Sequence, residues 1–262
     1  MIKLVVTDLD GTLLNSDSQM PKEIHDVISS LTSVGIRFVV ASGRQINNLR
    51  RLFNDRLDIF YIAQNGAHVE YGDKALYQQP IDDEDVRSII QKADTFGLYP
   101  MIYTKDTIYV KDTDPSFIER LNNYDLDYKV VNEFAPNCDV EKISLMSLDD
   151  EAKEYKNRFL SIEGVSVCIS HKDLLDVTRW DVSKGSALAL LQENLNISVD
   201  MTMAFGDAEN DLTLFEHSYY SFAMRNASEE VKKKARFIAS GNDENGVIQV
   251  LMNIDKYTTR DK

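Results

Sequence analysis

The sequence contains very little cysteine, with two in 262 residues. Cys138 and Cys168 each lie in or near a strand-like stretch, where a buried reduced thiol is commoner than a lone bridge or a nucleophile. We therefore expect reduced thiols and no disulfide framework. The four histidines are scattered and lack the spacing of zinc ligands, so the sequence does not indicate a zinc enzyme.

Basic residues and long apolar runs are also scarce. Lysine and arginine number 29 against 43 aspartates and glutamates, which gives a formal net charge of −14. Such a surface repels polyanions, so nucleic acid and anionic membranes are poor partners. No apolar run reaches the roughly 18 residues that cross a bilayer, and the N-terminus becomes charged too early for a signal peptide. We expect a cytoplasmic protein; the oligomeric state stays open.

The two ends of the chain alternate short apolar runs with segments of helical spacing. Strands are predicted at residues 2–7, 36–40 and 60–63, and helices at 24–31 and 46–53. After residue 183 the same alternation predicts helices at 184–195 and 211–215 and strands at 201–205 and 219–223. This order predicts an α/β fold with a doubly wound, parallel, Rossmann-like sheet.

The middle of the chain follows a different pattern. A hairpin is predicted over residues 68–78, around Gly72-Asp73, and Pro80 then marks a break. Beyond it the spacing predicts helices at 86–93, 117–121 and 152–160 and strands at 99–103, 107–110, 140–146 and 165–169. We therefore predict a core of residues 1–81 and 179–262, with residues 82–178 inserted as an α+β domain.

Two polar loops follow predicted strands in the first third of the chain. Asp8-Leu9-Asp10-Gly11-Thr12 places two carboxylates together, of which one could accept a phosphoryl group while the other moves protons. A plain Asp/Gly turn explains this pattern equally well. Ser42-Gly43-Arg44 precedes a helix, where a hydroxyl and backbone N–H groups can hold an anion, although a simple helix cap is the commoner explanation.

Two further polar loops lie in the last third. Ser183-Lys184-Gly185 puts a cation at a helix start, where the helix dipole favours an anion, although a solvated lysine is an equal alternative. Gly206-Asp207-Ala208-Glu209-Asn210-Asp211 crowds acidic and amide oxygens after a strand, a donor set that suits Mg²⁺. Acidic residues that stabilise a first helical turn are the alternative there.

Each of the four loops lies beyond a predicted parallel strand or at a helix start, where open α/β sheets bind ligands. With DLDGT, SGR, SKG and GDAEND in this order, the sequence resembles the haloacid dehalogenase superfamily of aspartyl-phosphate phosphatases. The long insertion between the second and third motifs resembles the Cof-type subfamily, whose large α/β cap covers the active site. Asn65-Gly66-Ala67, Met224-Arg225-Asn226-Ala227 and Gly246-Val247 extend the resemblance.

This resemblance implies roles for individual residues. Asp8 would be the nucleophile and Asp10 the general acid and base, with Thr12 helping to position Asp10 and with Ser42 and Lys184 also catalytic. Mg²⁺ would be bound by Asp8, by the main-chain carbonyl of Asp10 and by Asp207, with Asp211 supporting the metal from behind. Phosphate and substrate would contact Leu9, Ser42, Gly43, Arg44, Asn65, Lys184 and Asn210.

The resemblance therefore predicts a magnesium-dependent phosphatase that acts on a small phosphorylated metabolite. Sugar phosphates, pyridoxal phosphate and flavin mononucleotide are the substrate types it suggests. A phosphomutase, a phospho-accepting receiver-like signalling domain and a non-catalytic binding protein on a decayed scaffold are the alternatives. Two residues depart from the subfamily pattern: we expect Arg225 to lie outside the chemistry and Trp180 to lie near the hinge between cap and core.

Overall fold

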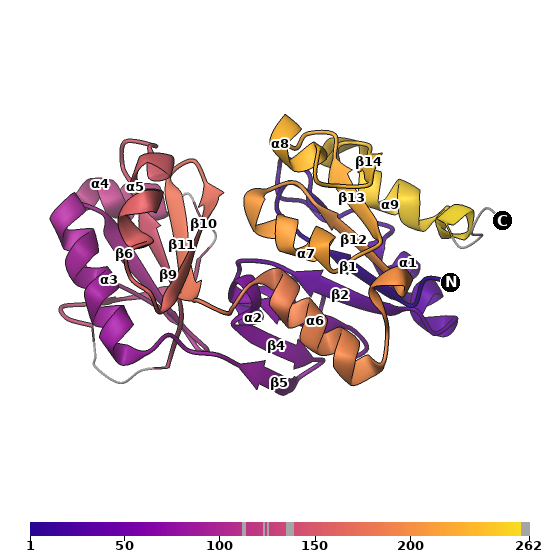
Figure 1. Ribbon diagram of the computed structural model, residues 1–262, viewed down its shortest axis with the longest axis horizontal. Helices are drawn as coiled ribbons and strands as arrows, with labels where there is room; N and C mark the ends of the chain where they lie inside the picture. The colour runs from indigo at the N-terminus through magenta and orange to yellow at the C-terminus, as the bar shows by residue number, and fades with distance from the viewer. Residues whose placement is uncertain (112–113, 123, 125, 135–138, 258–262) are drawn as a thin grey trace. The chain divides into compact units, whose positions relative to one another are not determined.

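The computed structural model describes residues 1–111, 114–122, 124, 126–134 and 139–257, so Cys138 lies outside the described residues. The chain forms two compact units (Figure 1). The outer unit comprises Met1–Tyr77 and Ser183–Lys262, and the inserted unit comprises Gln78–Val182. Within the described residues, no helix is both long enough and apolar enough to cross a membrane.

The outer unit is built on an eight-stranded sheet of order β14-β13-β12-β1-β2-β3-β4-β5 among the described residues. The pairs from β14 to β3 are parallel, and β4 runs antiparallel to β3. The predicted parallel α/β sheet is thereby confirmed. Its strands are β1 (Leu4–Thr7), β2 (Arg37–Ala41), β3 (Phe60–Ala63), β4 (His68–Tyr71), β5 (Lys74–Gln78), β12 (Thr202–Gly206), β13 (Tyr220–Met224) and β14 (Phe237–Ala239).

Helices cover both faces of this sheet, which explains why β1, β3, β12 and β13 are buried throughout. Val5 packs in one core cluster with residues of α1, α2 and α9, while Leu4 and Val6 pack in the other with residues of α6, α7 and α8. Each fully buried side chain of this kind contributes about 1.5–3 kcal/mol to stability. The helices are α1 (Ile24–Ser33), α2 (Ile46–Leu52), α6 (Lys184–Leu195), α7 (Leu212–Glu216), α8 (Glu229–Lys232) and α9 (Gly246–Leu251).

The inserted unit has a six-stranded, mostly antiparallel sheet of order β10-β11-β9-β6-β7-β8 among the described residues. Helices α3 and α5 pack their apolar faces with β9 and β11 in one cluster, and α4 contributes to a second cluster. The elements are α3 (Asp83–Phe96), β6 (Tyr99–Thr104), β7 (Ile108–Lys111), α4 (Pro115–Leu121), β8 (Tyr128–Val131), β9 (Val140–Met146), α5 (Ala152–Phe159), β10 (Val165–His171) and β11 (Leu174–Arg179). Cys168 lies in β10 and is partly buried.

The limits of the inserted unit differ from the predicted 82–178 by four residues at each end. At the first junction, Gln78 Nε2 donates to Glu141 Oε1 (3.1 Å) within the inserted unit. At the second, the backbone N–H of Trp180 donates to the carbonyl of Gly164 (3.0 Å), and the Trp180 side chain is exposed. These hydrogen bonds attach the linking residues to the inserted unit.

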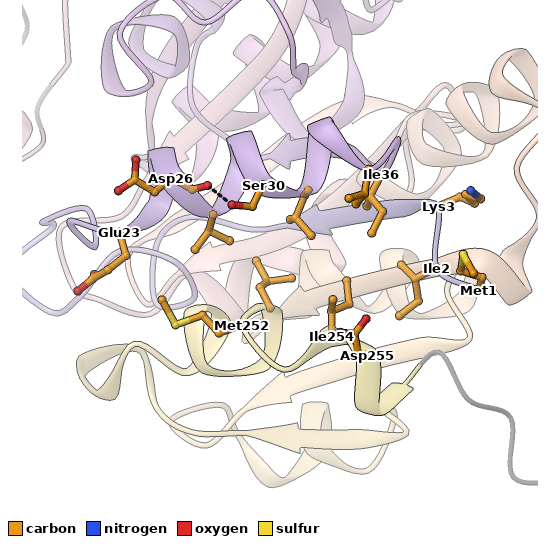
Figure 2. A pocket seen from close by; sticks show the side chains of 14 residues that line it. Met1, Ile2, Lys3, Glu23, Asp26, Ser30, Ile36, Met252, Ile254 and Asp255 are labelled. Atoms are coloured by element: carbon orange, nitrogen blue, oxygen red, sulfur yellow. Dashed lines mark hydrogen bonds between the residues drawn. The ribbon is translucent and has the colours of Figure 1, made fainter.

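A cavity of about 600 Å³ lies in the outer unit, between α1, α9 and the start of β1 (Figure 2). Its walls include Ile2, Leu31 and Leu251, and the exposed Met252 lies at its rim. Residues 1–3 line the cavity and lead into the start of β1. The cavity therefore lies at the edge of the sheet opposite to the C-terminal ends of the parallel strands. Its apolar walls and mainly acidic charged groups make it a poor phosphate site.

Candidate active site

Four loops meet at the edge of the outer sheet where the parallel strands end. The neighbouring strands β12, β1 and β2 run in the same direction, so the residues that follow them share that edge. Asp8 follows β1, Ser42 follows β2 and Asp207 follows β12. Helix α6 begins there at Lys184, because the Ser183 side chain caps its first turn. The structure therefore brings all four predicted loops together.

Lys184 forms the centre of this site. Its Nζ donates to Asp8 Oδ1 (2.6 Å) and to Asp211 Oδ1 (2.7 Å), and all three side chains are buried. Burial lowers the pKa of Lys184, but the Asp211 and Asp8 carboxylates raise it more, so the lysine stays charged. A cation in a first helical turn is unfavourable for the helix dipole, and the two carboxylates offset that cost.

Asp211 holds the acidic loop in shape as well as binding the lysine. Its Oδ2 accepts hydrogen bonds from the backbone N–H groups of Asp207 and Ala208, at 3.0 Å each. With Oδ1 bound to Lys184, both of its oxygens already have donors. Asp211 is therefore better placed to support a metal ion through the loop than to bind it directly. The helix predicted at 211–215 begins one residue later, at Leu212. Asp211 ends the short 3₁₀ turn η3 (Glu209–Asp211), which precedes that helix.

Asp207 lies beside the first loop. Its Oδ1 accepts a hydrogen bond from the hydroxyl of Thr12 (2.7 Å). Thr12 therefore orients Asp207, whereas the expectation was that it would position Asp10. Burial, followed by the nearby Asp211 carboxylate, raises the pKa of Asp207 to about 7. Burial and Asp211 likewise raise the pKa of Asp8 well above its ordinary value, although Lys184 lowers it.

These carboxylates fit a divalent cation. Asp8, Asp207 and Asp211 each offer an oxygen, and these oxygens lie within 4.8 Å of one another. Burial first, and then the neighbouring carboxylates, raise the pKa values of Asp8 and Asp207, and a bound cation would favour the ionised form of both. Asn210 Oδ1 is buried without a hydrogen-bond partner among the described residues, so this loop also has an unused acceptor. Carboxylate and amide oxygens are the donors that Mg²⁺ prefers.

Asp10 lies outside this cluster and is half exposed. Arg44 Nε donates to Asp10 Oδ2 (2.8 Å) and Arg44 Nη2 donates to Asp10 Oδ1 (2.6 Å), so both carboxylate oxygens are held by one guanidinium. Arg44 Nη1 in turn donates to Asn48 Oδ1 (3.0 Å). The side chain of Asp10 therefore faces an arginine, which leaves its main-chain carbonyl as the group for the predicted metal contact.

The remaining predicted phosphate contacts surround the same loops. Ser42 is buried and its Oγ accepts from the backbone N–H of Arg44 (3.2 Å). Gly43 lies between them and is partly exposed. The side chain of Leu9 is fully buried in a core cluster, so Leu9 can offer a ligand only its main chain.

Asn65 and Asn210 contact each other across the site. Asn65 is buried at the end of β3, and its Oδ1 accepts from Asn210 Nδ2 (3.0 Å). This hydrogen bond joins the third strand to the acidic loop. Asn210, the predicted phosphate contact, therefore has a protein partner for its amide nitrogen in this structure.

Three residues near the C-terminus support the first loop and were not predicted as site residues. Asn226 Nδ2 donates to the carbonyl of Gly11 (2.8 Å), and Asn242 Nδ2 donates to that of Leu14 (3.0 Å). Asp243 accepts from both the backbone N–H and the hydroxyl of Ser16, at 2.8 Å each. Only Asn226 had a signal, because it lies in the segment that resembles the Cof-type subfamily.

Arg225, one of the two departures from the subfamily pattern, pairs with Glu244 on the surface. Its Nη1 forms an exposed ion pair with Glu244 Oε2 (2.9 Å). The pair lies on the surface and does not include any of the clustered carboxylates.

The comparisons with known proteins agree with this site. The family model for haloacid dehalogenase-like hydrolases matches residues 5–251, and the chain therefore belongs to that family. The 5-amino-6-(5-phospho-D-ribitylamino)uracil phosphatase YwtE of Bacillus subtilis is 26% identical over 274 residues, covering 94% of this chain and 96% of that protein.

Solved structures show the same relationship. SMU.1108c from Streptococcus mutans matches with a TM-score of 0.92 and 28% identity, over 98% of this chain and 100% of that one. The HAD subclass IIB sugar phosphatase BT4131 matches with a TM-score of 0.83 and 25% identity, over 97% and 99%. The predicted class of enzyme, a phosphatase that hydrolyses phosphoric monoesters, is thereby confirmed.

A substitution at Gly11 tests whether activity depends on the close contact between the first loop and the Asp207 side chain. The φ of Gly11 is +79°, and a Cβ there would lie 2.8 Å from Asp207 Cγ and closer still to Oδ2. Gly35 has nearly the same φ, +81°, but open space around a Cβ. Each Gly→Ala change should cost roughly 1 kcal/mol or more in unfolding free energy because of the left-handed backbone.

Only Gly11→Ala should also lower phosphatase activity, by about tenfold or more, because only it displaces Asp207. Turnover of p-nitrophenyl phosphate and urea unfolding of both variants would measure this. Equal activity in the two variants would contradict the contact.

Proposed function

We propose that the protein is a Mg²⁺-dependent phosphatase that hydrolyses a small phosphorylated metabolite through a phosphoryl group carried by Asp8. The observation that carries this proposal is the pair of buried hydrogen bonds from Lys184 to Asp8 and Asp211, beside the carboxylate of Asp207. A fixed cation and converging carboxylates in one buried site suit phosphoryl transfer, which depends mainly on alignment and charge neutralisation.

Asp8 acts first in the proposed reaction. One of its carboxylate oxygens forms a bond to phosphorus while the bond from phosphorus to the leaving oxygen breaks. Lys184 donates to Oδ1 of that carboxylate and favours its ionised form, which partly offsets the effect of burial. Bound Mg²⁺, held by Asp8 and Asp207 with support from Asp211, would neutralise charge on the phosphoryl oxygens. Ser42 and the backbone N–H groups of its loop bind the phosphate.

Asp10 moves the protons in both halves of the reaction. It gives a proton to the leaving oxygen as the first bond to phosphorus breaks, and the alcohol departs. It then takes a proton from the water that attacks the phosphorus of the aspartyl phosphate, which releases inorganic phosphate and restores Asp8. The half-exposed position of Asp10, at the outer side of the site, supports this role because both water and the leaving group must reach it.

The substrate we propose is a phosphate monoester of a sugar or of a related polyol. Two relatives support this class: YwtE is named for a phosphorylated ribityl compound, and BT4131 is described as a sugar phosphatase. Phosphorylated cofactors such as pyridoxal phosphate or flavin mononucleotide belong to the same range of small metabolites. We assign substrate selection to the inserted unit, which interrupts the catalytic fold as a compact body of its own.

The alternatives are less well supported. A receiver-like signalling domain and a phosphomutase also form an aspartyl phosphate, but YwtE and BT4131, both named as phosphatases, match this chain over nearly their whole length. A decayed binding protein is disfavoured because Asp8, Asp10, Lys184 and Asp207 are all present and converge on one edge of the sheet.

Asp8→Asn tests the nucleophile. It should abolish turnover of p-nitrophenyl phosphate and of sugar phosphates, because a neutral amide cannot form the acyl phosphate. Circular dichroism should show an unchanged fold. Repeated turnover by the unmodified protein with Mg²⁺ separates an enzyme from a receiver, which would take up phosphate once. Activity retained in Asp8→Asn would remove the proposed nucleophile.

The pKa of Asp207 predicts how stability depends on pH and on metal. Because this pKa is raised to about 7 from an ordinary value of 3.8, the metal-free folded state holds a proton that the unfolded state has released. Metal-free stability should therefore fall as the pH rises from about 4 to about 7. Mg²⁺ should stabilise the protein more at pH 8 than at pH 5.5, since protons compete with it at low pH.

Thermal unfolding with and without Mg²⁺ at both pH values would test this, with Asp207→Asn as the control. That variant should lose most of the stabilisation by Mg²⁺ at pH 8. Stabilisation of equal size at both pH values, or a full effect of Mg²⁺ in Asp207→Asn, would contradict the assignment.

A further inference from the structure

The guanidinium of Arg44 is held by two different elements of the outer unit. Its Nε and Nη2 atoms form one edge and donate to the two oxygens of Asp10, at 2.8 and 2.6 Å. Its Nη1 donates to Asn48 Oδ1 on helix α2, at 3.0 Å. Arg44 is thus held by Asn48, which lies one helical turn later in the sequence, while its other edge holds the carboxylate of Asp10.

This arrangement argues against the role expected from the sequence motif, in which Arg44 contacts the phosphate. An arginine binds phosphate best through a two-donor edge, and the Nε–Nη2 edge of Arg44 is used by Asp10. Lys184, Ser42 and the backbone of the Ser42 loop remain as phosphate contacts. A guanidinium that is committed to a carboxylate affects the reaction through that carboxylate.

The pair also contributes little to the stability of the fold. The side chain of Asp10 is 52% exposed and that of Arg44 is 21% exposed. Water screens the pair on the side of Asp10, and holding the two side chains costs conformational freedom. Two parallel hydrogen bonds nevertheless fix both the direction and the plane of a carboxylate. Proton transfer to a leaving oxygen is sensitive to that geometry.

We propose that Arg44 is the positioning residue for Asp10, and that Asn48 anchors Arg44 in turn. This inference rests on the proposed function, because it gives Asp10 the proton transfers described above. The pair seen here holds Asp10 as the carboxylate that takes a proton from the attacking water. When Asp10 carries the proton for the leaving oxygen, one of the two hydrogen bonds is broken and the other still holds the carboxyl group. Its effect on catalysis therefore passes through Asp10, and binding of the phosphate group itself does not depend on it.

A double-mutant cycle in the full chain tests this, with p-nitrophenyl phosphate and Mg²⁺. Asp10→Asn should lower kcat by about 100-fold, the usual size of a general acid–base contribution, and Arg44→Ala by about tenfold. If Arg44 acts through Asp10, then Arg44→Ala added to Asp10→Asn should lower kcat by less than about twofold more. Arg44→Lys should restore only part of the activity, because an ammonium lacks the two-donor edge.

Inorganic phosphate separates positioning from binding. As a competitive inhibitor, it should bind Arg44→Ala about as tightly as the unmodified protein. The melting temperature should change little, because Asp10 is half exposed and water screens the pair on that side. Effects of Arg44→Ala and Asp10→Asn that multiply, or inhibition by phosphate that weakens in proportion to the loss of activity, would overturn the positioning role and favour direct phosphate binding.

Helix α2 offers a matched control for the anchor. Asn48 contacts Arg44, whereas its neighbour Asn47 is exposed on the same helix. Asn48→Ala should lower kcat severalfold and Asn47→Ala should leave it unchanged, and equal effects of the two would contradict the anchoring role. Activity that survives in Asp8→Asn would overturn the proposed function and this inference together. If Asp8→Asn is inactive but the effects of Arg44→Ala and Asp10→Asn on kcat multiply, only the positioning role of Arg44 would be overturned.

Discussion

The contact of Lys184 with Asp8 and Asp211 is the interaction on which the rest of the site depends. Three charges are buried together, and each would be costly to bury alone. The lysine offsets the repulsion between two carboxylates, and Asp211 passes this constraint to the backbone of the acidic loop. The position of Asp207 therefore depends on a charge supplied by a helix that begins more than twenty residues earlier in the sequence.

Asp8 and Asp10 differ in how deeply they are buried. Around Asp8 it removes water, so the lysine interacts strongly with its partners and the carboxylates hold their protons more tightly. Around Asp10 the side chain stays half exposed, and geometry is fixed by a two-donor arginine contact that has little value for stability. Asp8, the proposed nucleophile, thus lies in a highly charged interior, whereas Asp10, the proposed proton-transfer group, is half exposed.

The sequence predicted most of the outer sheet, most of the helices and the convergence of the four loops, because apolar runs on a parallel sheet and polar residues at strand ends follow simple rules. Strands β8, β11 and β14 and helix α8 were not predicted. Strand β8 is largely exposed, β11 buries the polar side chains of Asp176 and Thr178, and α8 and β14 are only four and three residues long. The partners of Thr12 and Arg44 could not be predicted either. Each partner is fixed by side-chain directions in the folded state, and Thr12 reaches Asp207 across 195 positions of sequence. The roles of the individual site residues stay predictions.

The order of the chain has a consequence for how this protein is made. The central strand β1 pairs with β12, but the inserted unit, which is one continuous segment, separates them. On a ribosome the inserted unit is complete before residue 202 is added, so it can fold while one edge of β1 still lacks its neighbour. The unpaired backbone edge of β1 is therefore exposed on the nascent chain for longer than any part of the inserted sheet, and chaperones would act most usefully there.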